Sequence, residues 1–88
     1  MPERKKVGKD WELILTNPSG DFTIQCVSPN GKEGELIREG TSPPLATKGG
    51  AMIPITHAGT QSNLPGTGNV YGRSYGGTDV EAEFFVSP

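Results

Sequence analysis

Cysteine and histidine are nearly absent from this chain of 88 residues, which has one of each, Cys26 and His57. A single cysteine cannot form a disulfide within the chain, so no internal cross-link of that kind can stabilise the fold. A structural zinc site needs four nitrogen or sulfur ligands at close spacing, and the chain does not supply them. We therefore expect neither a metal nor any other cofactor.

Large apolar residues are also scarce, because Leu, Ile, Val and Phe together make up only about a fifth of the chain. The 13 glycines and 8 prolines add little to a core. The net charge of −2 is nevertheless too small for a typical disordered chain. The composition predicts a folded domain with a small core, and such domains are usually stabilised by disulfides, metals or oligomerisation. With the first two excluded, association with other chains is the device that is left.

Long apolar runs are missing as well. The first residues, MPERKKVGKD, are charged and lack the apolar segment of a signal peptide. No run approaches the ~20 apolar residues that a membrane-spanning helix needs. We therefore expect a chain without a signal peptide or a membrane span.

Helical periodicity is absent too, since glycine or proline interrupts nearly every window that could keep a 3.6-residue apolar period. Alternation with period two is clearer, and it predicts short strands at 11–16, 22–27, 35–39, 51–57, 69–75 and 79–87. Turn residues lie between the first three strands, at 17–21 and at Asn30-Gly31, so these strands are expected to form an antiparallel meander. The predicted fold class is all-β: a small antiparallel β-sandwich or partly open barrel of five to six short strands with long Gly/Pro-rich loops.

The same alternation assigns a core. Its predicted members are the inward positions of the strands, Trp11, Leu13, Leu15, Phe22, Ile24, Cys26, Leu36, Ile53, Ile55, Val70, Val80, Ala82, Phe84 and Val86. Four apolar residues, Ile14, Val27, Ile37 and Phe85, fall on the opposite faces. They would either pack under the loops or form a patch for a partner.

Charge is distributed unevenly along the chain. Residues 1–9 have a net charge of +3, and residues 10–88 have a net charge of −5. We therefore expect a basic N-terminal arm at 1–9, followed by a single all-β domain at 10–88. The arm, with Arg4, Lys5, Lys6 and Lys9, is either a solvated tail or a segment that docks on the acidic body of a neighbouring subunit or on another acidic partner.

We find no pattern that predicts an enzyme. His57 lacks the neighbours of a catalytic triad, and Cys26 occupies an inward strand position that suits a small buried side chain. Glu81 and Glu83 lie on one face of a strand, where paired carboxylates could do acid–base work or bind calcium. Without a cleft, a charged outer face is the simpler interpretation of this pair. The glycines of 66–68 and 72–77 do not open a helix, as a phosphate-binding loop would require.

Residues 57–77, HAGTQSNLPGTGNVYGRSYGG, form a glycine-rich stretch that is long for a loop in a small domain. Ordering glycine costs much backbone entropy, and the small core is not expected to supply it, so contacts with other chains are expected to order the stretch. Within it, Tyr71, Arg73 and Tyr75 share one face of a strand and are the predicted partner-binding residues. Such a row could stack on bases, but the acidic body argues against nucleic acid. A sugar-binding surface built on the two tyrosines, with Trp11, is a further alternative.

A β-rich subunit with one cysteine, projecting loops and a basic arm resembles, in composition rather than in motif, small phage virion proteins such as head-decoration or tail-fibre components. This resemblance implies a structural subunit that docks on a larger repeating assembly of proteins through its arm and its glycine-rich stretch. The location would then be the virion, and otherwise the cytoplasm. The competing prediction is a stand-alone module that binds carbohydrate or peptide through residues 57–77.

Overall fold

The computed structural model describes residues 3–18, 22–40, 42, 44–45, 47–53, 60–62 and 67–87. None of these residues is helical, and the chain is all-β, as the alternation predicts. Eight strands are formed within the described ranges: β1 (Glu3–Val7), β2 (Glu12–Leu15), β3 (Thr23–Cys26), β4 (Gly34–Arg38), β5 (Ala51–Ile53), β6 (Thr60–Ser62), β7 (Val70–Ser74) and β8 (Ala82–Ser87).

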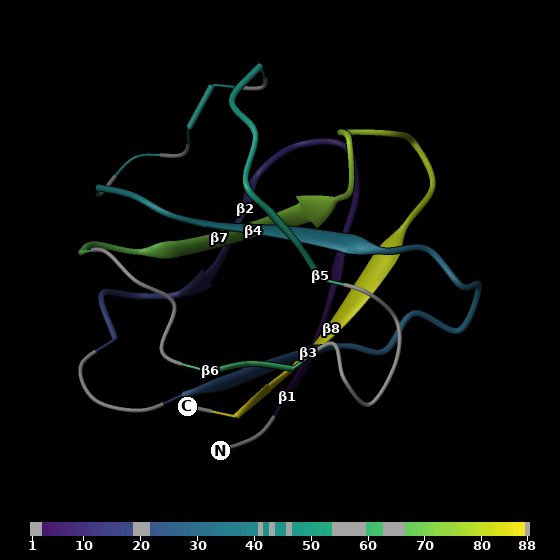
Figure 1. Ribbon diagram of the computed structural model, residues 1–88, viewed down its shortest axis with the longest axis horizontal. Coiled ribbons are helices and arrows are strands. Elements are labelled where there is room, and N and C mark those ends of the chain that lie inside the picture. The colour runs from purple at the N-terminus through teal and green to yellow at the C-terminus, as the bar shows by residue number, and fades with distance from the viewer. Residues whose placement is uncertain are drawn as a thin grey trace.

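The strands form two sheets, ordered β1-β8-β3-β6 and β2-β7-β4-β5. Every pairing between neighbouring strands is antiparallel. Figure 1 shows β2, β7 and β4 in an upper layer and β6, β3, β8 and β1 in a lower one. The arrangement is compatible with the expected small β-sandwich.

The core lies between the two sheets and draws on both. Its buried members are Val7, Ile14, Phe22, Ile24, Cys26, Leu36, Val70, Ala82, Phe84 and Val86. The fully buried Phe84 ring of β8 fits against two glycines of the opposite sheet. A Cβ atom on Gly34 would overlap this ring, and one on Gly72 would lie 2.9 Å from its Cε2 atom. Part of the glycine content therefore makes room for a large core side chain.

The predicted meander of residues 11–39 is wrong. β2 pairs with β7, β3 pairs with β6 and β8, and β4 pairs with β5 and β7. The connections from β1 through to β4 therefore each cross from one sheet to the other, as do those from β5 through to β8, and only β4 and β5 are consecutive strands of the same sheet. Each strand can bury its apolar face in either arrangement, so alternation in the sequence does not decide between them.

The Asn30-Gly31 turn forms, but it does not join neighbouring strands. Gly31 has a φ of 82°, and its N–H donates to the Ser28 carbonyl at 3.2 Å. This conformation explains why residue 31 is glycine, because a positive φ strains any residue that has a Cβ atom. The turn lies within the connection from β3 to β4, which belong to different sheets.

The predicted count of five to six strands is too low. Two of the additional strands are β1, within the predicted basic arm, and β6, within the glycine-rich stretch. The predicted strand at 69–75 is present as β7, which lies between β2 and β4. The expectation that other chains order this stretch is wrong for residues 70–74, because β7 pairs on both sides with strands of its own chain.

Two predicted core positions are exposed instead. Leu13 is 46% exposed and Val80 is 51% exposed, whereas Leu15 is partly buried and packs against the core. Leu13 and Ile14 lie on opposite faces of β2, and Ile14 is the one that enters the core; the pairing with β7 then shifts at a β-bulge between Leu13 and Leu15. Of the remaining predicted core positions, Ile53 belongs to β5 and Ile55 lies outside the described residues.

Candidate interaction surface

Strand β7 brings Tyr71 and Arg73 of the predicted row to the outer face of its sheet, opposite the core-facing Val70 and Gly72, and Tyr75 lies in the turn that follows the strand. Tyr71 is 2% exposed and Arg73 is 5% exposed, whereas Tyr75 is 42% exposed. Of these three side chains, only Tyr75 presents a substantial surface. The two buried side chains do not offer a flat face on which a base or a sugar could stack.

Arg73 is buried by a cluster that the sequence did not indicate. Glu35 lies opposite it on β4, and its Oε1 atom accepts a hydrogen bond from Arg73 Nε at 2.9 Å. The side chains of this ion pair are only 6% and 4% exposed. The guanidinium group of Arg73 also lies 4.3 Å from the centre of the Trp11 ring, which is a cation–π distance. Trp11, expected in the core, is thus buried on the outer face of the sheet.

The Glu35 carboxylate ties two connecting segments to the sheet. It accepts hydrogen bonds from the backbone N–H of Gly50 at 2.6 Å and of Gly76 at 3.2 Å. Arg73 adds a bond from its Nη2 atom to the Lys48 carbonyl at 3.0 Å. Figure 1 shows the segment that contains Lys48 and Gly50, drawn in teal, arching above the upper layer. The cluster therefore holds a cover over the outer face of this sheet.

The electrostatics of Glu35 follow from these contacts. Burial raises the pKa of its carboxyl group, but the hydrogen bonds from Arg73 and from the two backbone N–H groups lower it by more. The net effect is a pKa below the ordinary value of 4.5. Glu35 is therefore a charged structural anchor near neutral pH, and no proton transfer by this group is indicated.

The predicted basic residues lie on or beside β1. Arg4, Lys5 and Lys6 belong to this strand, which pairs with β8, and Lys9 is exposed in the connection to β2. Arg4 Nη1 forms an ion pair with Glu83 Oε2 at 3.1 Å. The docking of these residues on another chain stays a prediction.

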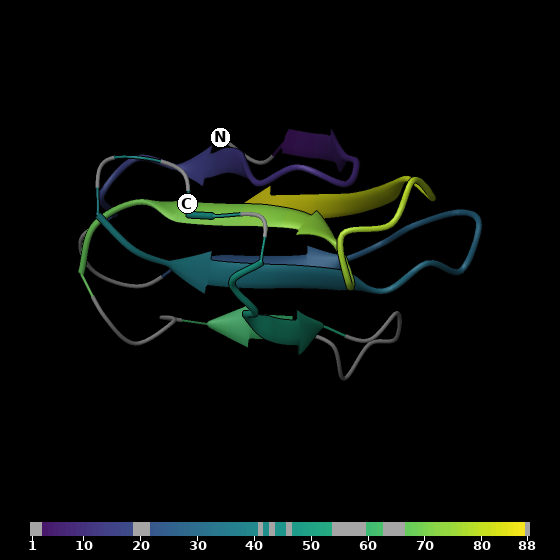
Figure 2. The same ribbon diagram turned by 90° about the horizontal axis from the view of Figure 1, so that it is seen from above.

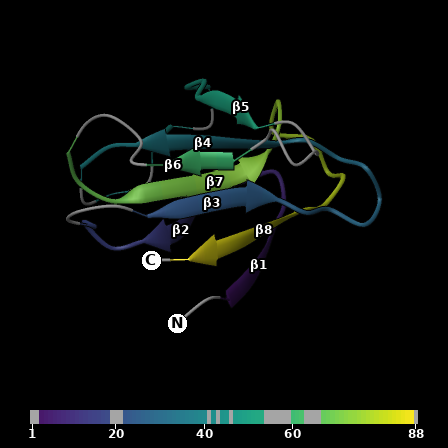
Figure 3. The same ribbon diagram turned by 60° about the horizontal axis from the view of Figure 1, so that its bottom comes forward.

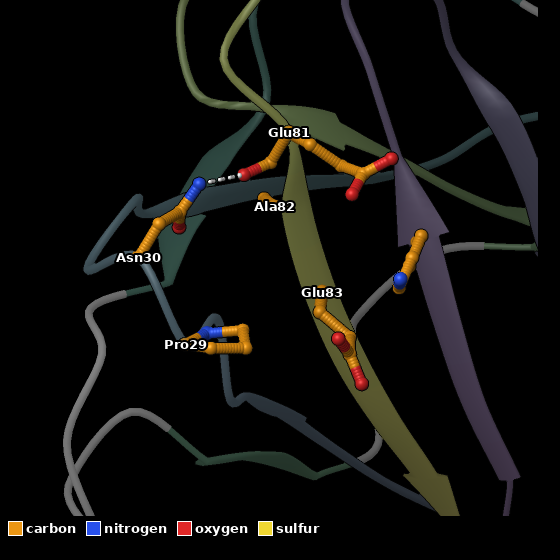
Figure 4. A pocket seen from close by; sticks show the side chains of 6 residues that line it. Pro29, Asn30, Glu81, Ala82 and Glu83 are labelled. Atoms are coloured by element: carbon orange, nitrogen blue, oxygen red, sulfur yellow. Dashed lines mark hydrogen bonds between the residues drawn. The ribbon is translucent and has the colours of Figure 1, made fainter.

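The two carboxylates considered for chemistry do not form a joint site. Glu81 is exposed, but Glu83 is buried on β8, contrary to the expectation of a solvated outer face. Both line a hollow of about 200 Å³ with Asn30, whose Nδ2 atom donates to the Glu81 carbonyl at 2.9 Å. Figure 4 shows that the two carboxylate groups do not converge on one point. Among the described residues, no group of three or more His, Cys, Asp or Glu side chains could hold a metal ion.

The remaining candidates for chemistry are Cys26 and His57. Cys26 is buried, as its inward position predicts, and its Sγ atom lies 3.4 Å from Ser28 Oγ and 3.5 Å from the Lys32 carbonyl. His57 lies outside the described residues. No helix in the described part of the chain is long and apolar enough to cross a membrane.

A further candidate surface lies where β1 and β2 form the edges of their sheets. Within the described structure each of these strands has one neighbour only, β8 for β1 and β7 for β2. Figure 2 shows both strands along one side of the molecule, with β5 and β6 along the opposite side, and Figure 3 shows β1 and β5 at opposite ends of the view. Between β1 and β2 lies a hollow of about 210 Å³, lined by Lys5, Lys6, Val7, Glu12, Leu13 and Ile14. We call β1, β2 and this hollow the open side.

The open side contains both buried core residues and an exposed apolar side chain. Val7 and Ile14 belong to the buried core, and Leu13 is a large apolar side chain exposed on an edge strand. The exposure of Leu13 was not predicted because Trp11, Leu13 and Leu15 were taken as the inward face of the strand, whereas Trp11 and Leu13 lie on the outer face and Ile14 lies in the core. No family model, no curated protein and no solved structure matches the chain.

Proposed function

We propose that the chain is a non-enzymatic structural subunit that docks on other protein chains in a larger assembly. The observation that carries this proposal is the open side, where two adjacent sheet edges flank a hollow that reaches the core residues Val7 and Ile14. A sheet edge is a ready-made surface for another chain, because a further strand can form hydrogen bonds with its backbone N–H and C=O groups.

Coverage of the open side would also add buried apolar area to a domain that has little. Leu13 is about half exposed. Burying the exposed part of a leucine contributes roughly 1 kcal/mol. The small core makes such a contribution a larger share of the total than it would be in a bigger domain.

The finer proposal is a virion component, of the head-decoration or tail-fibre kind. It rests on the composition of the chain and on its basic segment, with Arg4, Lys5, Lys6 and Lys9 as contact residues toward acidic partners. Three of these residues belong to β1 and so to the open side, where a partner that covers this side would contact them.

Sedimentation velocity, combined with thermal unfolding at each concentration, tests the proposed function. We expect either an oligomer or a monomer of low stability that a partner stabilises, since binding to the folded state alone raises the apparent stability. A monomer at every concentration, with a sharp and concentration-independent thermal transition, would contradict an assembly role.

A further inference from the structure

The four sheet edges of the described structure differ in how well they are protected against pairing. β1 has three consecutive cations, Arg4, Lys5 and Lys6, and β6 has the polar sequence Thr60-Gln61-Ser62. β5 has only three residues, and Pro54 follows it in the sequence. Charges, proline and polar residues are the usual means by which proteins block strand addition at an edge.

β2 lacks most of these protections. Its sequence, Glu12–Leu15, has three consecutive large aliphatic residues after a single charge. Leu13 is exposed on the outer face, and the hollow of the open side lies directly beside it. The features of β2 that oppose strand addition are the charge of Glu12, the β-bulge and the short length.

From this comparison we propose that β2 pairs with β2 of a second copy of the chain, antiparallel and about a twofold axis. The proposal rests on the proposed function and names its partner and its surface. The two sheets that contain β2 would join into one, in the order β5-β4-β7-β2-β2-β7-β4-β5. An isologous contact of this kind closes after two copies and does not propagate into a fibre.

Charge favours the pairing of β2 with β2 of a second copy over the pairing of β1 with β1. In an antiparallel pair of β2 strands the two Glu12 residues lie at opposite ends, and the aliphatic residues face one another across the axis. A pair of β1 strands would instead oppose Arg4, Lys5 and Lys6 to their own copies, and like charges directly opposite are destabilising. Leu13 of one copy comes close to Leu13 of the other, which covers the exposed apolar side chain.

Charge exchange at Leu13 tests the pairing. Leu13→Lys and Leu13→Glu each place like charges close together across the twofold axis, whereas an equimolar mixture of the two variants places opposite charges there. Because Leu13 is about half exposed on the outer face, both variants should fold, which circular dichroism checks. Leu45→Lys and Leu45→Glu are the matched controls, since Leu45 is 77% exposed and lies outside the strands.

We expect the wild type to dimerise between about 1 µM and about 1 mM in sedimentation equilibrium, a range typical of weak association. Each Leu13 variant alone should raise the dissociation constant about tenfold or more, the mixture should restore dimers, and the Leu45 variants should behave as the wild type does. An oligomer that both Leu13 variants leave intact would overturn the pairing and leave the assembly role standing. A monomer throughout would also overturn the pairing, and a sharp, concentration-independent thermal transition would then contradict the assembly role as well.

Discussion

Replacing Glu35 with glutamine should destabilise the fold more than any substitution of an exposed charge. The carboxylate accepts three hydrogen bonds, from Arg73 Nε, Gly50 N and Gly76 N. Glutamine keeps one acceptor oxygen and turns the other position into a donor, so at least one N–H group loses its partner. It also leaves the charge of Arg73, 94% buried, without its counter-ion. Breaking a buried ion pair in this way costs about 3–5 kcal/mol.

Urea unfolding, followed by tryptophan fluorescence, measures this loss directly. Trp11 is the only tryptophan in the chain and lies against Arg73, so its emission reports on the cluster itself. Glu39→Gln is the matched control, because Glu39 forms an ion pair with Lys48 in which both side chains are more than a third exposed. Exposed pairs contribute about 0–1 kcal/mol, so the control should unfold at nearly the wild-type urea concentration.

A double substitution keeps the test decisive if Glu35→Gln does not fold. Arg73→Met alone should be as harmful as Glu35→Gln, since it leaves the Glu35 carboxylate buried without a counter-ion. Glu35→Met combined with Arg73→Met removes both charges and should recover much of the lost stability, because apolar replacements of buried pairs are often neutral. A free energy of unfolding of Glu35→Gln within about 0.5 kcal/mol of the wild type would refute the assignment of Glu35 as the anchor.

Three further predictions follow from the described contacts. Because the pKa of Glu35 is lowered in the folded state, the ionised carboxylate stabilises the fold above pH 4.5, and this stabilisation is lost as the pH falls through the folded-state pKa. The free energies of unfolding of wild type and Glu35→Gln, measured with urea, should therefore converge on acidification. A difference between them that stays constant with pH would contradict this prediction. Gly34→Ala should cost about 1–3 kcal/mol by overlap with Phe84, with partial rescue by Phe84→Leu, whereas Gly8→Ala, which has open space around it, should cost less in the same thermal scan. The buried Cys26 thiol should react with a chromogenic disulfide reagent only after denaturation, and labelling of the native protein at the rate of a free thiol would show that it is accessible.

The sequence predicted the fold class because alternation reports directly on which residues face a core. Phe22, Ile24 and Cys26 are buried as expected, and so are Ala82, Phe84 and Val86. Alternation does not report which strands pair. β2 and β3 each bury one face whether they are neighbours in one sheet or face each other across two, so the meander and the observed crossing connections have the same local pattern.

The candidate surface was predictable only in part, because burial on the outer face depends on distant segments. Tyr71 and Arg73 were placed on the correct strand, but their exposure could not be inferred. The cover that buries Arg73 comes from Lys48 and Gly50 and is attached by Glu35. Nothing in the local sequence distinguishes Glu35 from an exposed glutamate, since its role depends on a partner 38 residues away.

Hydrogen exchange followed by mass spectrometry, at low and at high protein concentration, tests the central claim that the chain docks through its open side. The account predicts that concentration slows exchange of backbone amides within residues 3–15, which contain β1 and β2, and leaves the interior strands β3 and β8 unchanged. Association that slows exchange only in other segments, with residues 3–15 unaffected, would contradict the claim.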